Sequence, residues 1–127
     1  MIGRPLRERE LAILRTRWLC GSEYEWGVHV MVFAASAGLS DEEVRATCAA
    51  MRPAGLFAAR DEAILRLCDA LHATASVDVA LLGDLARELS SSQIVKLIPL
   101  AGFNHTVAFA TNALCIALEP SAARFPS

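Results

Sequence analysis

Hydrophobic residues recur at three- and four-residue spacing along most of the chain, which is the period of amphipathic helices. The first such segment runs from about Leu6 to Leu19. Its apolar stripe is formed by Leu11, Leu14 and Trp18, and Gly21 is placed to end the helix. No segment shows a convincing strand pattern. The pattern therefore predicts an all-α protein.

Three serines precede an acidic or amide residue at capping-box spacing. In a capping box the serine hydroxyl accepts a hydrogen bond from the third helical amide, and the later side chain reaches back. The three pairs are Ser22 with Glu25, Ser40 with Glu43, and Ser90 with Gln93. Each pair predicts the start of a helix. The helix after Ser22 is expected to end at Gly38, and the helix after Ser40 is expected to end near Met51, ahead of a turn.

Two further helices are predicted over residues 61–72 and 78–89, where apolar residues share one face. The last helix contains the uncharged segment Leu97–Leu118, which is long enough to cross a bilayer. Polar residues within it, such as Asn104, are expensive in lipid but ordinary in a buried helix with hydrogen-bond partners. We therefore predict a central buried helix here, about six helices in all, and a frayed tail after Pro120.

The length of 127 residues fits a single domain, predicted to span residues 1–127 with a core at residues 6–120. Hydrophobic residues make up 54% of the chain and aromatic residues only 6%. The mean hydropathy of +0.39 is high for a protein of this length. Part of the apolar surface is therefore expected to face another copy of the protein.

The net charge of −2 leaves no basic surface for phosphate groups. Nucleic acid and anionic membranes are therefore not expected as partners. The four cysteines have neither Cys-x-x-Cys nor zinc-ligand spacing, so they are interpreted as buried thiols in a reducing compartment. The N-terminal residues lack the apolar run of a signal peptide. A cytoplasmic location is expected.

Three polar residues are candidates for acid/base chemistry. Glu25 and His29 are four residues apart, so on a helix their side chains share a face, and a carboxylate there can orient an imidazole. Glu10 lies beside the buried stripe of the first helix, and a buried acid needs a partner. If the first two helices form a hairpin across Gly21, Glu10 can approach His29. The alternatives are a capping role for Glu25 and a pairing of Glu10 with a nearby arginine.

The other two histidines carry weaker signals. His105 lies in the uncharged segment, where its side chain either hydrogen-bonds a neighbour or lines a pocket. His72 lies late in its helix, where an imidazolium favourably meets the helix dipole, and it is assigned no function. No His-x-x-x-His or Glu-x-x-His pairing is present, so no metal site is predicted.

Four segments carry a resemblance to a known family. They are Arg7-Glu8-Arg9-Glu10-Leu11-Ala12-Ile13-Leu14-Arg15-Thr16, Ser22-Glu23-Tyr24-Glu25-Trp26-Gly27-Val28-His29, Gly38-Leu39-Ser40-Asp41-Glu42-Glu43, and Phe103-Asn104-His105-Thr106-Val107-Ala108-Phe109 with Asn112-Ala113-Leu114. Together they resemble the carboxymuconolactone decarboxylase family over roughly residues 6–120. The resemblance implies an alkylhydroperoxidase-D-like helical fold assembled into trimers or hexamers. Similar sequences usually carry a further helix before the first segment, so a shortened start or a helix supplied by a neighbouring subunit is expected.

The peroxidase-like branch of that family has a Glu followed by a Cys-x-x-Cys-x-x-x-His motif. Glu10 and His29 match the Glu and the His, whereas Ser22 and Glu25 stand where the cysteines would be. A dithiol peroxidase needs one thiolate to attack and a second to resolve. The resemblance therefore favours the decarboxylase branch, which works without cofactor or metal.

That resemblance implies a role for each candidate residue. His29 would donate a proton, with Glu10 and Glu25 orienting it, and Arg15 or Arg17 would anchor a substrate carboxylate. The residues expected to contact substrate are Ser22, Tyr24, Trp26 and His105. The leading hypothesis is a cofactor-free lyase for a small carboxylated lactone or related organic acid. The alternatives are an alkylhydroperoxidase-like antioxidant protein using Cys20 and a non-catalytic small-molecule-binding oligomer.

Overall fold

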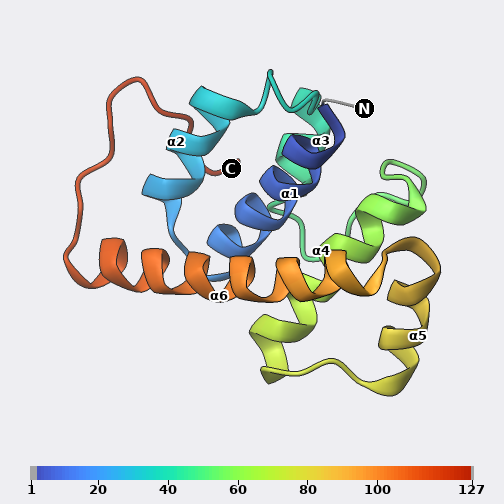
Figure 1. Ribbon diagram of the computed structural model, residues 1–127. Helices are drawn as coiled ribbons and strands as arrows, with labels where there is room; N and C mark the ends of the chain where they lie inside the picture. Colours follow the sequence, from blue (N-terminus) through green and yellow to red (C-terminus); the bar gives the residue numbers. More distant parts are fainter. Residues whose placement is uncertain (1–2, 127) are drawn as a thin grey trace.

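The computed structural model describes residues 3–126, which form six helices and no strand. The helices are α1 (Gly3–Leu19), α2 (Glu23–Phe33), α3 (Asp41–Ala46), α4 (Ala59–Thr74), α5 (Val79–Glu88) and α6 (Ser91–Ala113) (Figure 1). The predicted all-α class is confirmed. Two helices end earlier than expected: α2 ends at Phe33, followed by turns up to Gly38, and α3 ends at Ala46.

Helix α1 lies at the centre of the fold and packs against α2, α4 and α6 (Figure 1). Every residue from Glu10 to Arg17 is buried. Leu11 and Leu14 are fully buried in the hydrophobic core, and Trp18 packs against it, as the apolar stripe predicted. Because this stretch is surrounded on all sides, its polar residues are buried together with its leucines. That burial creates the polar interior described below.

Two of the three predicted capping boxes are confirmed. At Ser40 and at Ser90 the hydroxyl accepts a hydrogen bond from the third helical amide, and the Glu43 or Gln93 side chain accepts one from the serine amide. The serine before α2 makes no side-chain capping bond, so that prediction is wrong. Its hydroxyl is engaged elsewhere in the interior, as shown below.

Helix α6 is not the central buried helix that the sequence predicted. It crosses the molecule with α1 and α2 on one side and α5 on the other (Figure 1), and its buried residues are Ala101, Asn104 and Ala108, which form one stripe. Among the described residues it is the one helix long and apolar enough to cross a membrane, although only 17% of that apolar window is buried. The prediction failed because the helix carries no charge on either face after Lys96, so the sequence did not distinguish its apolar outer face from its packed face.

The tail after Pro120 is irregular in structure but not frayed, which corrects the expectation. The Phe125 ring packs edge-on against Trp26 at a centroid distance of 5.4 Å. The Phe125 amide donates to Glu23 Oε2 at 2.7 Å. The tail approaches α2 at Gly27, where an added Cβ would lie 2.0 Å from the carbonyl oxygen of Ala123. The tail thus covers one side of the helix that carries His29.

Candidate functional site

The hairpin between α1 and α2 brings Glu10 and His29 together, as the sequence suggested it would. The chain reverses at Gly21, whose φ of +68° is a conformation that glycine adopts without strain. Glu10 Oε1 lies 2.7 Å from His29 Nδ1. The Glu10 side chain is fully buried, whereas 17% of the His29 side chain is exposed. We call Glu10 and His29 the acid–base pair.

The second carboxylate oxygen of Glu10 is short of partners. Oε2 is buried and has no hydrogen-bond donor among the described residues. The guanidinium of the half-exposed Arg9 approaches it, with Nε at 3.5 Å. A buried carboxylate oxygen without a hydrogen-bond donor is costly, so the contacts of Glu10 with His29 and Arg9 are needed to offset its burial.

The geometry fixes which imidazole nitrogen is available for proton transfer. An ionised carboxylate can only accept, so His29 Nδ1 donates to Glu10 and Nε2 is left to take up or release a proton. The ring packs against Phe33 at a centroid distance of 5.0 Å. The Arg9 guanidinium in turn lies over the Phe33 ring, 5.9 Å from its centroid.

Glu25 does not orient His29, contrary to the sequence-based hypothesis. Its Oε2 accepts a hydrogen bond from Arg17 Nη1 at 3.1 Å instead. Arg17 Nε also donates to Asn104 Oδ1 on α6 at 2.9 Å. Burial lowers the pKa of Arg17, although Glu25 and Glu10 partly counteract the effect. The charged, buried guanidinium forms a stronger hydrogen bond with the Glu25 carboxylate than a histidine one helical turn away would form.

The predicted substrate-binding residues are not gathered around the acid–base pair. Ser22 is buried, and its hydroxyl lies 2.9 Å from Thr111 Oγ1 on α6, which explains the missing cap. The Tyr24 hydroxyl donates to Glu119, and Trp26 Nε1 donates to Thr47 Oγ1 at 3.1 Å in the core. These polar groups are engaged within the chain, and their contact with a substrate stays a prediction.

Arg15 is unsuited to the carboxylate-anchoring role that the sequence suggested. It is buried, and its guanidinium donates to Asp69 and to the carbonyl oxygens of Thr47 and Ala49. Its cation also lies over the Trp18 ring at 4.8 Å. These contacts hold the turn after α3 against α1, so the role of Arg15 is structural.

Two other cations, which the sequence analysis did not single out, are better placed to bind a substrate carboxylate. Arg9, on α1, and Lys96, on α6, line a surface hollow of about 410 Å³. The other lining residues are Pro5, Glu8, Leu89, Gln93, Leu97 and Leu100. Arg9 links this hollow to the acid–base pair because it also approaches Glu10. The sequence signal was the position of Arg9 next to Glu10, but the approach of Lys96 from α6 depends on the tertiary fold.

All four cysteines are free thiols, but only Cys68 is fully buried; Cys20 and Cys48 are half-buried and Cys115 is exposed. The interpretation of all four as buried is therefore wrong. Burial raises the pKa of Cys48 to about 11 and that of Cys68 to about 12, and it also raises the pKa of Cys20. A raised pKa leaves little thiolate for attack on a peroxide, so this geometry lends the peroxidase alternative no support.

Within residues 3–126 one group of side chains has donor atoms close enough to hold a metal ion. It consists of Cys20, His72 and His105, which we call the thiol–imidazole cluster, and its ligand atoms all lie within 4.8 Å of one another. Burial and the neighbouring His105 lower the pKa of His72, whose imidazole is then neutral near pH 7. The members come from distant parts of the chain, so their spacing gave no sign of the cluster.

Comparison with known proteins identifies the family. The sequence model of the Carboxymuconolactone decarboxylase family matches residues 3–70, which hold Glu10, Glu25 and His29. The C-terminal part of the resemblance noted above, around Asn104, lies outside the matched residues. No curated protein and no solved structure matches the chain significantly. The match covers more than half of the 127 residues, and the chain therefore belongs to the carboxymuconolactone decarboxylase family.

Proposed function

We propose that the protein is a cofactor-free, decarboxylase-like lyase that acts on a small carboxylated lactone or related organic acid. The observation that carries the proposal is the 2.7 Å contact between Glu10, which is fully buried, and His29, which is partly exposed. A buried carboxylate that accepts a hydrogen bond from Nδ1 holds the imidazole in one tautomer and one orientation. Family membership supports a decarboxylase-like role for this pair.

The chemistry requires one proton at one place. When the carbon–carboxylate bond breaks, carbon dioxide leaves, and its bonding electron pair stays on the substrate, delocalised towards the lactone carbonyl. His29 in its protonated form donates the Nε2 proton to a carbon of the delocalised anion, and Glu10 stabilises the imidazolium through Nδ1–H. Nε2 then regains a proton from solvent. No oxidant or reductant is consumed.

The substrate carboxylate would be held by Arg9 and Lys96. Both cations line the hollow of about 410 Å³, and the hollow also has an apolar wall of leucines. A site that combines a few charged groups with apolar walls suits a small organic acid. Arg9 would bring the substrate towards His29, since its guanidinium lies close to both Glu10 and the ring of Phe33.

The test is turnover of γ-carboxymuconolactone, followed as loss of substrate and release of carbon dioxide. The parent protein should react, and His29→Ala should lose about 10²- to 10⁴-fold of the rate, as expected for a missing general acid. Cys115→Ser, which changes an exposed residue outside both clusters, is the matched control. Full activity in His29→Ala would overturn the mechanism. Ligand-induced stabilisation of the parent without turnover would point instead to the non-catalytic binding protein.

We also propose that a second copy of the chain covers the outer face of α6. The exposed side chains of this helix include Val95, Phe103 and Phe109, each more than 60% exposed. Exposed aromatic and aliphatic groups on one face are typical of surfaces buried on assembly. Phe103→Glu with Phe109→Glu should shift the molar mass measured by light scattering to that of the monomer. A parent protein that is already monomeric would contradict the proposal.

A further inference from the structure

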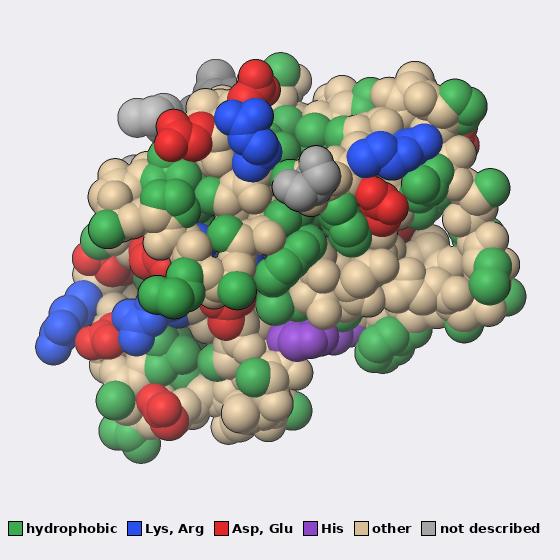
Figure 2. All heavy atoms as spheres, turned by 180° about the vertical axis from the view of Figure 1, so that it is seen from behind, with side chains coloured by type: hydrophobic (Ala, Val, Ile, Leu, Met, Phe, Trp, Pro, Cys, Tyr) green, Lys and Arg blue, Asp and Glu red, His purple; other side chains and the backbone are tan. Residues whose placement is uncertain are grey.

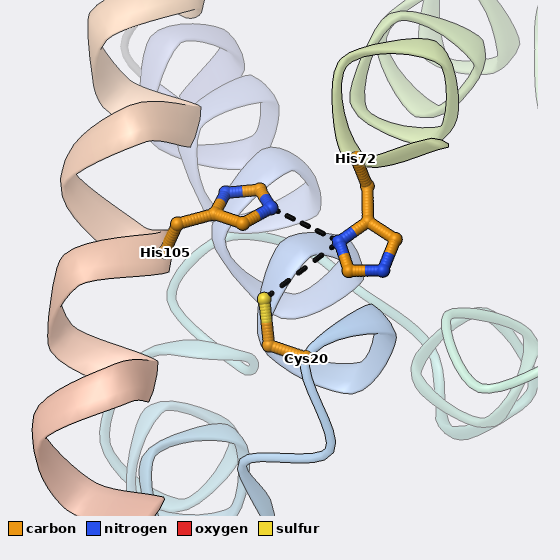
Figure 3. Close-up of side chains that lie close together, drawn as sticks. All are labelled: Cys20, His72 and His105. Carbon is orange, nitrogen blue, oxygen red and sulfur yellow. Dashed lines mark hydrogen bonds between the residues drawn. The ribbon is translucent and has the colours of Figure 1, made fainter. Parts of the chain in front are cut away.

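Three side chains from separate parts of the chain point towards one another beside α6 (Figure 3). Cys20 follows the last residue of α1, His72 lies in the last turn of α4, and His105 lies on α6. Cys20 Sγ is 3.8 Å from His72 Nδ1, and His72 Nδ1 is 3.0 Å from His105 Nε2. The proposed acid/base chemistry uses none of these three groups.

The orientation of His105 is that of a metal-binding histidine. Its Nδ1 lies 2.8 Å from the carbonyl oxygen of Ala101. A carbonyl only accepts, so Nδ1 carries the proton, and the lone pair of Nε2 is directed at His72. Histidines that bind metals commonly donate their other ring N–H to a backbone carbonyl in this way, which fixes the tautomer.

The donor atoms are spaced like the corners of a zinc polyhedron. Bond lengths of about 2.0–2.1 Å to nitrogen and about 2.3 Å to sulfur in a tetrahedral site separate two nitrogens by about 3.3 Å and a nitrogen from a sulfur by about 3.6 Å. The separations of 3.0 Å between the imidazoles and 3.8 Å from Cys20 to His72 lie close to these values. The remaining edge, from Cys20 to His105, is no longer than 4.8 Å.

The scaffold around the cluster holds these side chains in place. Asn112 Nδ2 donates to the carbonyl oxygen of Cys20 at 2.9 Å, which ties the end of α1 to α6. The rings of His72 and His105 stack with centroids 5.2 Å apart, and Phe109 packs edge-on against His105. Three donors, one just after α1 and the others on α4 and α6, therefore converge, so metal binding would require little reorganisation.

We propose that Cys20, His72 and His105 form a binding site for a divalent transition-metal ion of the zinc class. One thiolate and two imidazoles suit Zn²⁺ and Co²⁺, whereas Mg²⁺ and Ca²⁺ prefer oxygen ligands. Three protein ligands leave a fourth position for water or a small molecule. In the single chain that position is accessible, because His72 is exposed. Figure 2 shows histidine at the molecular surface, with hydrophobic side chains on the same face.

A shallow hollow next to the thiol–imidazole cluster offers space for a ligand bound at the fourth metal position. Its volume is about 270 Å³, and His105 forms part of its lining. The other lining residues are Leu71, Ala75, Ile98, Ala101 and Gly102, so the hollow is largely apolar. A small apolar molecule bearing one metal-binding group fits this combination of surfaces.

The experiment is a titration of the full chain, produced without a histidine tag and treated with a chelator, with Co²⁺ and then Zn²⁺. One Co²⁺ per chain should bind with a thiolate-to-metal charge-transfer band in the near ultraviolet, and Zn²⁺ should displace it. Cys20→Ser should remove the charge-transfer band. His72→Ala should weaken Zn²⁺ binding by at least about 100-fold, since losing even a residue that only hydrogen-bonds to a metal ligand lowers the affinity about 10- to 100-fold.

Matched variants separate this site from other thiols and imidazoles. Cys115→Ser and His29→Ala should bind Zn²⁺ as the parent does, because neither residue belongs to the cluster. Circular dichroism of each variant shows that the helices are retained. The proposal is overturned if no thiolate–cobalt band appears, if His72→Ala binds Zn²⁺ with the parent's affinity, or if Cys115→Ser removes the signal.

Discussion

The acid–base pair and the thiol–imidazole cluster both use histidine, yet they place the imidazole in opposite surroundings. His29 contacts a fully buried carboxylate, which the guanidinium of Arg9 also approaches. His72 is exposed and meets a thiol and a second imidazole, which are neutral lone-pair donors. A buried charge next to histidine favours proton transfer, whereas convergent soft donors near the surface favour ion binding. The same residue type therefore lies in two environments in one small fold, each suited to a different chemistry.

The largest expected effect comes from removing the charge of Glu10 while keeping its shape. Glu10→Gln should reduce kcat by about 10²-fold or more, because the imidazolium loses its stabilising partner. Nitrogen NMR of the His29 ring checks the cause, since the Nδ1–H tautomer should no longer dominate. If Glu10→Gln kept the parent's kcat, the buried carboxylate would have no part in catalysis, and the proposed functional difference between the two histidine sites would be wrong.

The two regions should also differ in what they contribute to stability. Arg17→Met removes the buried cation shared by Glu25 and Asn104, and it should lower the free energy of unfolding by about 3 kcal/mol. His72→Ala, at an exposed position, should change it by less than about 0.5 kcal/mol. Urea denaturation of both variants measures the contrast. Equal losses would mean that the cluster is part of the folding core.

Gly27 tests whether the C-terminal tail supports the helix that carries His29. Gly27→Ala places a Cβ 2.0 Å from the carbonyl oxygen of Ala123, and it should cost about 2 kcal/mol by displacing the tail. Gly83→Ala is the matched control, because nothing lies within 4 Å of its added Cβ and alanine favours a helix by about 0.5–1 kcal/mol. Zinc binding should survive both changes. A Gly27→Ala protein as stable as the parent would show that the tail does not press on α2.

The smallest expected effects distinguish an exposed serine cap from a buried serine. Ser40→Ala removes a capping box and should cost about 1 kcal/mol. Ser22→Ala should cost only about 0.5 kcal/mol, because Thr111 also donates to backbone carbonyls of its own helix. Thermal denaturation of both variants gives the order. A larger loss of stability for Ser22→Ala than for Ser40→Ala would indicate that the hydrogen bond between Ser22 and Thr111 is a main contact between the start of α2 and α6.

The sequence predicted those features that depend on neighbouring residues. The apolar stripe of α1 and the caps at Ser40 and Ser90 are local patterns, and each is confirmed. Ser22 has the same pattern, but it does not cap α2, because its hydroxyl is hydrogen-bonded to that of Thr111, 89 residues away. Local propensity gives way wherever a tertiary partner competes for the same group.

The candidate site shows the same limit. The contact between Glu10 and His29 followed from a short hairpin, so sequence reasoning could reach it. The hydrogen bond from Arg17 to Asn104 joins residues 87 positions apart. It holds the Arg17 guanidinium beside Glu25, so the Glu25 carboxylate pairs with Arg17 and not with His29 as predicted. The packing of three helices likewise assembles the thiol–imidazole cluster, so no spacing rule could reveal it.

The central claim, that Glu10 and His29 act as one unit, is tested most directly by a double-mutant cycle on γ-carboxymuconolactone turnover. The four proteins are the parent, Glu10→Gln, His29→Ala and the variant with both changes. Residues that act as a unit lose their effect together, so the double variant should be no slower than His29→Ala alone. Losses that simply multiply would show that the two residues act independently, and the account of a coupled acid–base pair would be wrong.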